Sequence, residues 1–375
     1  MLGMALPLDI CIRGGGIVGY TLALLLGRER LRVGLVAPAA PAQSGKRPDV
    51  RAYALNQASK ELLASLRCWP DPEAATAVLR MQVSADRGGT VSFDAAELGT
   101  PALTWIVDVP VLEAHLADAV RFQPQIELLQ APVPAALTVV CEGKASSTRA
   151  EFGVDFEVTP YAQHAIAARV ACANPHEQVA RQWFADGEIL AFLPLGGAAG
   201  NSVAIVWSVT PEHATRLLAA SAEDFCHELQ ATSQHSLGQL RLASERALWP
   251  LQKARARQWT GHGAAGAWAL AGDAAHNVHP LAGQGLNMGL ADVAELARLI
   301  RARESWRAVG DDRVLRRYER ARKAGVLPMA MGSDGLQWLF SQHGGAWSAL
   351  RNWGMSGIDR SGPLKQWMAR QAMGF

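Results

Sequence analysis

The stretch that decides the fold is Leu270-Ala-Gly-Asp-Ala-Ala-His-Asn-Val-His-Pro-Leu-Ala-Gly-Gln-Gly-Leu-Asn-Met-Gly-Leu-Ala-Asp292. The apolar run at residues 268–271 predicts a buried strand that ends at Gly272 and Asp273. From about Gly285 we expect a helix whose apolar residues share one stripe, namely Leu286, Leu290, Val293, Ala297 and Ile300. Such an order places a carboxylate at the end of a strand and backbone N–H groups at the start of a helix. That edge of a sheet suits an anionic or electron-rich ligand.

A second glycine motif stands near the N-terminus. Residues 9–13 predict a strand, and Gly14, Gly16 and Gly19 follow it as G-x-G-x-x-G. We expect a helix after them and a second strand at residues 31–37. The arrangement is typical of dinucleotide binding, because the glycines allow a tight turn and a close approach to a pyrophosphate. The same spacing recurs at residues 261–266, but there it precedes a strand and predicts only a turn.

Residues 270–292 resemble the second flavin-binding motif of the FAD-dependent aromatic hydroxylases, most closely the ubiquinone-biosynthesis branch, and the resemblance extends over nearly the whole chain. It implies that Gly14, Gly16 and Gly19 hold the FAD pyrophosphate and that Asp273 contacts the ribityl or pyrophosphate region. The remaining cofactor contacts that it implies in this motif are Gly272, Pro280, Gly283, Gln284, Gly285, Leu286 and Asn287. With one such nucleotide-binding unit, FAD rather than NAD is the expected resident ligand.

Simpler interpretations of the same residues stay open. Gly285 and Gly289 would also let a helix pack closely, and Asp273 could cap a helix. His276 and His279 are three residues apart, but no cysteine or acid stands at ligand spacing around them, so we expect loop histidines and no metal site.

Smaller landmarks lie between the two motifs. Arg51 belongs to a segment that resembles the family's Asp-x-Arg-x-x-Ala-Leu sequence, whose arginine lies by the flavin, although an arginine taken by itself is more often a surface charge. Asn56 is the expected N-cap of a helix at residues 57–66. A strand at residues 105–108 should lead into a helix. Glu142 stands where the family's Asp-Gly motif, which serves FAD and the pyridine nucleotide, has an aspartate.

Three features depart from the family pattern. The second strand should end in an acid that binds the adenosine ribose, but this position is Ala37. Arg13 replaces an apolar strand residue directly before the glycines. Residues 130–136 form a short connection where the family places several strands. Ala37 and Arg13 bear directly on how tightly FAD is held.

The expected fold class is α/β, with a Rossmann-like FAD-binding domain, an inserted mixed β-sheet substrate domain and a helical C-terminal region. We assign residues 1–70, 106–150 and 264–330 to the FAD-binding domain, 71–105 and 151–263 to the substrate-binding sheet, and 331–375 to the C-terminal helices. Strands are expected at residues 163–172, 189–193 and 202–209. Residues 187–195 and 249–251 resemble the sheet that roofs the substrate site, although an ordinary sheet core would account for most of them.

Composition limits the class of protein. The 375 residues carry a formal charge of +2, which gives no electrostatic argument for nucleic acid. Five scattered cysteines fit neither a disulfide framework nor a zinc site and favour a reducing cytoplasm. No signal peptide or membrane span is expected. The C-terminal residues are rich in Trp, Met and basic side chains, which suits an apolar core, the surface of the inner membrane or a quinone-biosynthesis complex.

The resemblance implies an FAD-dependent NAD(P)H:oxygen monooxygenase that hydroxylates the ring of an apolar prenylated phenol in ubiquinone biosynthesis. NADPH or NADH would be the transient reductant, and O₂ and the phenol would be the other partners. No catalytic acid or base can be assigned. A cofactor-poor scaffold in a quinone-biosynthesis complex is the alternative, and a flavin reductase acting on isoprenoid double bonds is a second one. The intact residues 272–287 favour a working flavin site over the scaffold.

Overall fold

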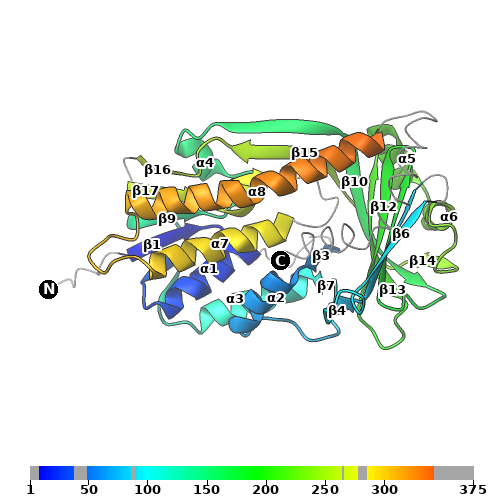
Figure 1. Cartoon of the computed structure of the whole chain (residues 1–375), viewed down its shortest axis with the longest axis horizontal. Coiled ribbons are helices and arrows are strands. Elements are labelled where there is room, and N and C mark those ends of the chain that lie inside the picture. The colour runs from blue at the N-terminus through cyan, green and yellow to red at the C-terminus, as the bar shows by residue number, and fades with distance from the viewer. Residues whose placement is uncertain (1–7, 38–48, 86–88, 264–265, 278–284, 342–375) are drawn as a thin grey trace.

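The computed structural model of the chain describes residues 8–37, 49–85, 89–263, 266–277 and 285–341, with side chains placed up to residue 327. Its helices and strands form two groups along the longest axis (Figure 1). A helix-covered sheet occupies one end and a large, mostly antiparallel sheet the other. The α/β class and the insertion of a mixed sheet into a Rossmann-like fold are thus confirmed.

The first sheet has six strands in the order β16-β17-β9-β1-β2-β8, all parallel except the hairpin partner β16. Its strands are β1 (Leu8–Arg13), β2 (Val33–Val36), β8 (Ile126–Leu129), β9 (Ala135–Val140), β16 (Thr260–Gly263) and β17 (Gly266–Leu270). The predicted strands before both glycine motifs are therefore present, and β9 alone separates them. Gly263 pairs with Gly266, so the third glycine pattern lies at the paired ends of two antiparallel strands.

Four longer helices belong to this end of the molecule: α1 (Ile17–Arg28), α3 (Val109–Arg121), α7 (Gly285–Arg301) and α8 (Asp312–Ser341). The helix α1 packs against both α3 and α7, and α8 packs against α7. The predicted apolar stripe of α7 is confirmed, because Leu290, Val293 and Ile300 are completely buried in the core of this end. A short helix α4 (Ser147–Glu151) follows β9.

A three-stranded sheet connects the two ends. It consists of β3 (Ala52–Leu55), β7 (Thr104–Asp108) and β4 (Ala75–Val78), with β7 in the middle. The helix α2 (Gln57–Ser65) follows β3, and the Asn56 side chain caps it by accepting the Ser59 N–H, as predicted. Ile106 of β7 packs with Ala180 and Ala204 of the large sheet. The proposed domain boundary between residues 105 and 106 falls within strand β7. The division into domains stays a prediction.

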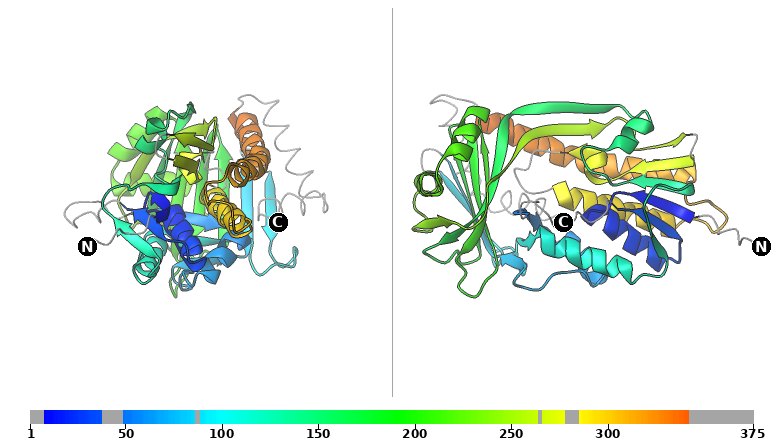
Figure 2. Two further views of the ribbon diagram at one scale, coloured as in Figure 1. Left: turned by 90° about the vertical axis from the view of Figure 1, so that its left-hand side faces the viewer. Right: turned by 180° about the vertical axis from the view of Figure 1, so that it is seen from behind.

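The large sheet has nine strands, eight of them in the order β18-β15-β10-β13-β12-β11-β5-β6, with β14 paired to β10. They are β5 (Arg80–Ala85), β6 (Thr90–Asp94), β10 (Phe156–Cys172), β11 (Val179–Ala185), β12 (Glu188–Pro194), β13 (Ser202–Val209), β14 (Leu240–Leu242), β15 (Ala247–Ala256) and β18 (His276–Asn277). The long strands β10 and β15 reach back along the molecule to the parallel sheet (Figure 2). There β15 pairs with β18, which lies within the 270–292 stretch.

Two helices on the large sheet were not expected from the sequence: α5 (Pro211–Ala219) and α6 (Ala222–Thr232). Their N-caps are Thr210 and Ser221, each of which accepts a backbone N–H three residues later. Both helices pack on the face of the sheet that carries Leu190, Phe192 and Trp207. Because side chains alternate along a strand, the opposite face of β12 carries Ile189 and Ala191.

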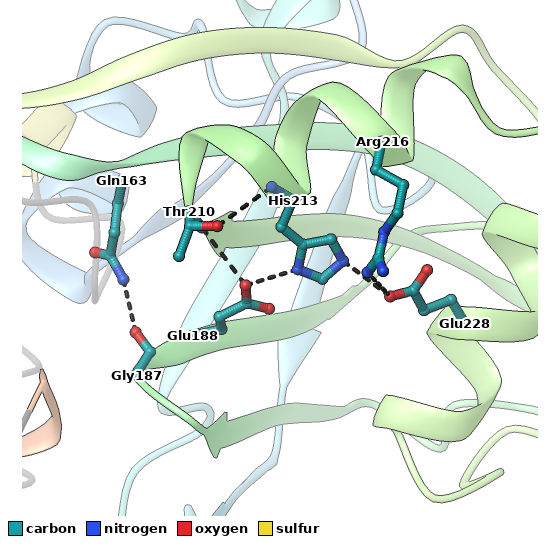
Figure 3. A network of polar contacts seen from close by, with 7 residues as sticks. All are labelled: Gln163, Gly187, Glu188, Thr210, His213, Arg216 and Glu228. Carbon is teal, nitrogen blue, oxygen red and sulfur yellow. Dashed lines mark hydrogen bonds and ion pairs between the residues drawn. The ribbon is translucent and has the colours of Figure 1, made fainter. Parts of the chain in front are cut away.

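A polar network fixes these helices to the sheet (Figure 3). The His213 ring lies between two carboxylates, with Nδ1 2.6 Å from Glu188 Oε1 and Nε2 2.8 Å from Glu228 Oε1. Arg216 Nη2 donates to the same Glu228 oxygen at 2.9 Å. None of the described helices combines the length and apolarity that crossing a bilayer requires. All five cysteines are buried and unpaired.

Candidate functional site

The N-terminal glycine motif forms a tight loop at the end of β1. Gly14 has a φ of +123°, and a Cβ added to it would lie 2.4 Å from the carbonyl oxygen of Cys141. A Cβ on Gly19 would lie 1.9 Å from the Gly14 carbonyl oxygen. A larger residue at position 14 would push the loop away from the end of β9, and one at position 19 would push helix α1 away from the loop. Both glycines are therefore required by close backbone packing.

The loop leads into the open N-terminus of α1. Gly16 is the N-cap and has no side chain to satisfy the first N–H groups, and space around its Cβ position is empty to 4 Å. The first turn of a helix carries unpaired N–H groups and the positive end of the helix dipole. The end of α1 can therefore receive a phosphate oxygen without moving any side chain.

The second motif brings Asp273 to the same edge of the sheet. Gly272, with a φ of +62°, begins a single 3-10 turn, η1 (Gly272–Ala274), directly after β17. The Asp273 side chain is partly buried and accepts a 3.3 Å hydrogen bond from Asn277 Nδ2. Burial raises the pKa of Asp273, and Lys144 and His276 only partly oppose this effect. The structure thus places the carboxyl group of Asp273 at the strand edge, as predicted.

A second carboxylate, Asp292, lies behind Asp273 and was not singled out from the sequence. It is completely buried in α7 and accepts hydrogen bonds from Gly272 N (2.9 Å), His276 Nε2 (2.6 Å) and Arg322 Nε (2.7 Å). Burial alone would raise its pKa, but the charges and hydrogen bonds of His276 and Arg322 lower it overall. The signal that could have revealed it is an acid beside the apolar stripe of α7.

The prediction that His276 is a loop histidine is wrong. His276 is buried on strand β18, pairs with Arg255 of β15, and stacks on Trp259 with ring centroids 4.7 Å apart. Its strand and its bond to Asp292 were not visible locally, because both partners are distant in sequence. His279 lies outside the described residues. Among those residues no cluster of metal-ligating side chains occurs.

The start of α7 is tied to the three-stranded sheet through Asn287. Its Nδ2 donates to the Ala54 carbonyl at 2.8 Å, and its Oδ1 accepts from Asn56 N and Ser59 Oγ. Leu286 packs against the core. Gly285 begins the helix, and Gly289 approaches Val18 of α1, where a Cβ would lie 2.9 Å from Val18 Cγ2. Pro280, Gly283 and Gln284 lie outside the described residues, so their predicted cofactor contacts stay predictions.

Arg51 lies just before β3, which is an edge strand of the three-stranded sheet. Its Nε donates to both oxygens of Asp49 at 2.9 Å, and its Nη2 lies 3.7 Å from Glu113 Oε1. The hydrogen bond to Asp49 and the charges around it raise the pKa of Arg51 despite its burial. The guanidinium is thus held in place by acids of the chain.

Glu142 and Arg13 contact each other rather than standing apart. Glu142 accepts hydrogen bonds from Ser146 Oγ (2.7 Å) and Thr148 Oγ1 (2.6 Å), which fixes the turn before α4. Arg13 Nη1 donates to Glu151 at 2.8 Å, and its Nε lies 3.5 Å from Glu142 Oε1. The charged residue before the glycines is therefore neutralised within the chain, and a cofactor contact by Glu142 stays a prediction.

Ala37 ends the segment after β2, directly beside the glycine loop. A Cβ on Gly15 would lie 2.4 Å from Ala37 Cβ, so the Ala37 side chain points toward this loop. At residue 37 the chain therefore offers a methyl group where the dinucleotide-binding pattern has a carboxylate for the ribose. The glycine loop, the open helix end and Asp273 fit the pyrophosphate and sugar region of a dinucleotide, whereas the contact to the adenosine ribose is absent at residue 37.

A large apolar cavity lies between the three-stranded and nine-stranded sheets. It encloses about 1040 Å³ including its open mouth. Arg51 and Tyr53 line it on one side, and Ile189, Ala191 and Trp249 on the other. Both segments predicted to roof a substrate site thus contribute to its wall. Its size and apolar lining suit a small organic ligand with an aromatic or isoprenoid part.

Comparisons with known proteins point in the same direction. A family model described as an FAD binding domain matches residues 112–331. The chain is 31% identical to 3-demethoxyubiquinol 3-hydroxylase of Escherichia coli, over 98% of this chain and 99% of that protein. It is 30% identical to the ubiquinone hydroxylase UbiL of Rhodospirillum rubrum, over 98% of this chain and 89% of that protein.

Solved structures share the fold at lower identity. The p-nitrophenol 4-monooxygenase PnpA from Pseudomonas putida superposes with a TM-score of 0.74 at 18% identity, covering 97% of each chain. PqsL of Pseudomonas aeruginosa, solved in complex with 2-aminobenzoylacetate, gives a TM-score of 0.73 at 20% identity, covering 89% of this chain and 97% of that one. At these identities the likeness establishes the architecture alone.

Proposed function

The chain belongs to the family of FAD-dependent monooxygenases that contains the ubiquinone-biosynthesis hydroxylases, and from this premise we propose that it uses NAD(P)H and O₂ to hydroxylate an apolar prenylated phenol in ubiquinone biosynthesis. The family establishes FAD as the cofactor, and O₂ and a small molecule as the substrates. The choice of reductant and of the prenylated phenol is our proposal.

The observation that carries the proposal is the shared cavity. Arg51, in the segment expected beside the flavin, and Ile189 and Ala191 of the large sheet line one and the same space. A cofactor held by the glycine loop and a substrate held by the large sheet would therefore meet at the β3 strand. An apolar wall suits a ring that carries an isoprenoid chain.

The chain's own residues have a limited set of tasks in this reaction. Gly14, Gly16 and Gly19 would hold the pyrophosphate of FAD, and Asp273 would accept a hydrogen bond from its ribityl or pyrophosphate region. When bound in this site, FAD would supply the redox chemistry, with NAD(P)H as the source of electrons and O₂ as the source of the added oxygen. The cavity walls position the ring and exclude water.

Oxygen uptake by the FAD-loaded protein tests this proposal. With NADPH or NADH as reductant, we expect faster O₂ consumption when 2-geranylphenol is added. Ala191→Trp should fill the cavity and abolish the stimulation while leaving the spectrum of bound FAD unchanged. Leu128→Trp, on the exposed edge strand β8, is the control that should retain it. If FAD binds but neither nicotinamide reduces it anaerobically, the enzyme proposal fails and the scaffold alternative gains support.

We also propose that the C-terminal segment brings the protein to a membrane surface or a quinone-biosynthesis complex. The proposal rests on sequence alone, since residues 342–375 lie outside the described part of the chain. Arg351, Arg360, Lys365 and Arg370 stand there against the single acid Asp359. Basic residues next to aromatic ones favour anionic lipid surfaces. The full chain should sediment together with anionic vesicles. Neutral vesicles are the control, and the chain should stay in the supernatant with them.

A further inference from the structure

Tyr53 is a polar side chain in the wall of the apolar cavity that the proposed function does not yet use. It lies on β3, where it pairs with Val107 of β7, and its side chain packs partly against the core of the cofactor end. It lines the cavity together with Ala191 and Trp249 from the opposite wall. Its phenol group therefore lies where the two ends of the molecule meet.

The Tyr53 hydroxyl lies within the influence of the Arg51 charge, two residues earlier. The Arg51 guanidinium, which is fixed by Asp49, lines the same side of the cavity as Tyr53. Arginine has only donors, so the Arg51 side chain cannot accept the phenol proton. The O–H proton of Tyr53 then remains available, and no described residue accepts it.

The charge state of Tyr53 agrees with a donor role. Burial raises the pKa of Tyr53, and the neighbouring Arg51 charge only partly opposes this effect. Asp273 and Asp49 add to the rise. The hydroxyl is therefore protonated at neutral pH and can donate. The charge of Asp273 contributes to the raised pKa of Tyr53, so the Tyr53 hydroxyl lies on the side of the cavity that faces the proposed FAD site.

The other hydroxyl on the same wall has a partner within the chain. Thr104 Oγ1 donates to the Leu55 carbonyl at 2.9 Å. The opposite wall also has polar groups, namely Arg181, Gln182 and Ser208, and Arg181 donates to the carbonyls of His176 and Val179. The rest of the lining is aliphatic or aromatic, and such a lining can hold an isoprenoid chain but cannot orient a ring oxygen. An oriented ring is needed if the hydroxyl group is to be added at one position.

We propose that Tyr53, beside Arg51 in the cavity wall, donates a hydrogen bond to the ring oxygen of the phenolic substrate and thereby sets which way the ring faces in the cavity. This inference rests on the proposed function, because it names the residue that recognises the phenol in the same site. Tyr53 touches the substrate but forms no covalent bond. A donor at the ring oxygen also stabilises the negative charge of the ionised, more electron-rich phenol.

Binding of a phenol and of its methyl ether to the FAD-loaded protein tests the inference. Dissociation constants for 2-geranylphenol and 2-geranylanisole are measured by the change in flavin fluorescence. The wild type should prefer the phenol about 10-fold, the effect of one well-placed hydrogen bond to a charged or ionising group. Tyr53→Phe should abolish that preference by weakening phenol binding alone, and Tyr161→Phe on β10, outside the cavity lining, should retain it.

The outcomes separate this inference from the proposed function. If the wild type does not discriminate, or if Tyr53→Phe keeps the preference or weakens both ligands equally, Tyr53 does not recognise the phenol. If 2-geranylphenol fails to stimulate O₂ uptake by the wild type, the proposed function fails. Unchanged FAD affinity and melting temperature in Tyr53→Phe would show that the variant is folded, which is expected because Asp49 still pairs with Arg51.

Discussion

Each end of the molecule contains a network of one histidine, carboxylates and an arginine, but the two networks differ in burial. At the cofactor end, the side chains of Asp292 and His276 are 0% and 4% exposed, and Arg322 forms an ion pair with Asp292. At the large sheet, His213, Glu188 and Glu228 are 14%, 19% and 35% exposed (Figure 3). The first network holds the backbone of the Gly272 turn, whereas the second holds two helices on the face opposite the cavity.

The difference shows how similar chemistry serves two purposes. A buried charge is stable only when its partners are complete, so the Asp292 network permits few arrangements of η1, β18 and α8. It thereby fixes the turn that presents Asp273. A network that water can reach tolerates the loss of a partner, because solvent replaces it. We therefore expect substitutions in the two networks to differ in both size and kind of effect.

The largest effect is expected for Asp292→Asn. Removing the charge leaves His276 and Arg322 buried without their common partner, which should cost about 3–5 kcal/mol of unfolding free energy. Urea unfolding at neutral pH measures it. Loss of less than about 1 kcal/mol would place this network in the same class as the exposed one.

The loss of stability in Asp292→Asn should also depend on pH. The folded-state pKa of Asp292 lies below its ordinary value of 3.8, so its stabilising contribution is fully present above that value. The contribution is lost as the pH falls through the lower folded-state pKa. The stability difference between wild type and Asp292→Asn should therefore stay constant from neutral pH down to about pH 4 and narrow below it.

Asp273→Ala should act on the cofactor rather than on the fold. Asp273 is partly buried at the strand edge and, within the described residues, accepts a hydrogen bond from Asn277 alone, so its loss should weaken FAD binding by about 1.5–3 kcal/mol. Fluorescence titration gives the affinity, and urea unfolding of the FAD-free protein is the control. Equal FAD affinity in wild type and variant would remove Asp273 from the binding site.

Ala37→Glu should have a smaller effect, in the opposite direction. The Ala37 side chain points toward the glycine loop, so a carboxylate there can reach the adenosine ribose. We expect FAD to bind about 1.5 kcal/mol more tightly, or roughly 10-fold. Ala37→Gln, which keeps the length but not the charge, is the matched control. An unchanged dissociation constant would mean that another group holds the ribose.

The smallest effect is expected for Glu228→Gln in the outer network. The variant removes one of two carboxylates beside His213, and because the site is partly solvated, stability should fall by no more than about 1 kcal/mol. The affinity for 2-geranylphenol should not change, since the network lies behind the sheet. A drop comparable to that of Asp292→Asn would erase the distinction between the two ends.

The sequence predicted well those parts that depend on local backbone geometry. The strand, the glycine loop and the helix of each motif need particular residues at fixed spacing, so Gly14, Gly19 and the stripe of α7 could be placed beforehand. The cap at Asn56 was equally local. Three strands of the large sheet, β10, β12 and β13, were predicted from runs bounded by Gly, Pro and Asn, although β10 begins earlier, at Phe156.

What the sequence did not predict depends on contacts between distant residues. Asp292 meets Arg322 from another helix, and the β18 pairing of His276 needs Arg255 of β15. Tyr53 lines the cavity only because β3 and the large sheet, which are distant in sequence, lie next to each other. The helices α5 and α6 were missed although Thr210 and Ser221 are good N-caps, because the surrounding strands dominated the pattern.

The central claim is that the glycine-bound cofactor and the apolar cavity form one active site for aromatic hydroxylation. Incubation of the FAD-loaded protein with NAD(P)H, 2-geranylphenol and isotopically labelled O₂ tests it most directly, with product analysis by mass spectrometry. The account predicts a product that gains one oxygen atom, carries the label and is absent with Ala191→Trp. A product without the label, or O₂ consumption that yields only hydrogen peroxide at the same rate with and without the phenol, would contradict it.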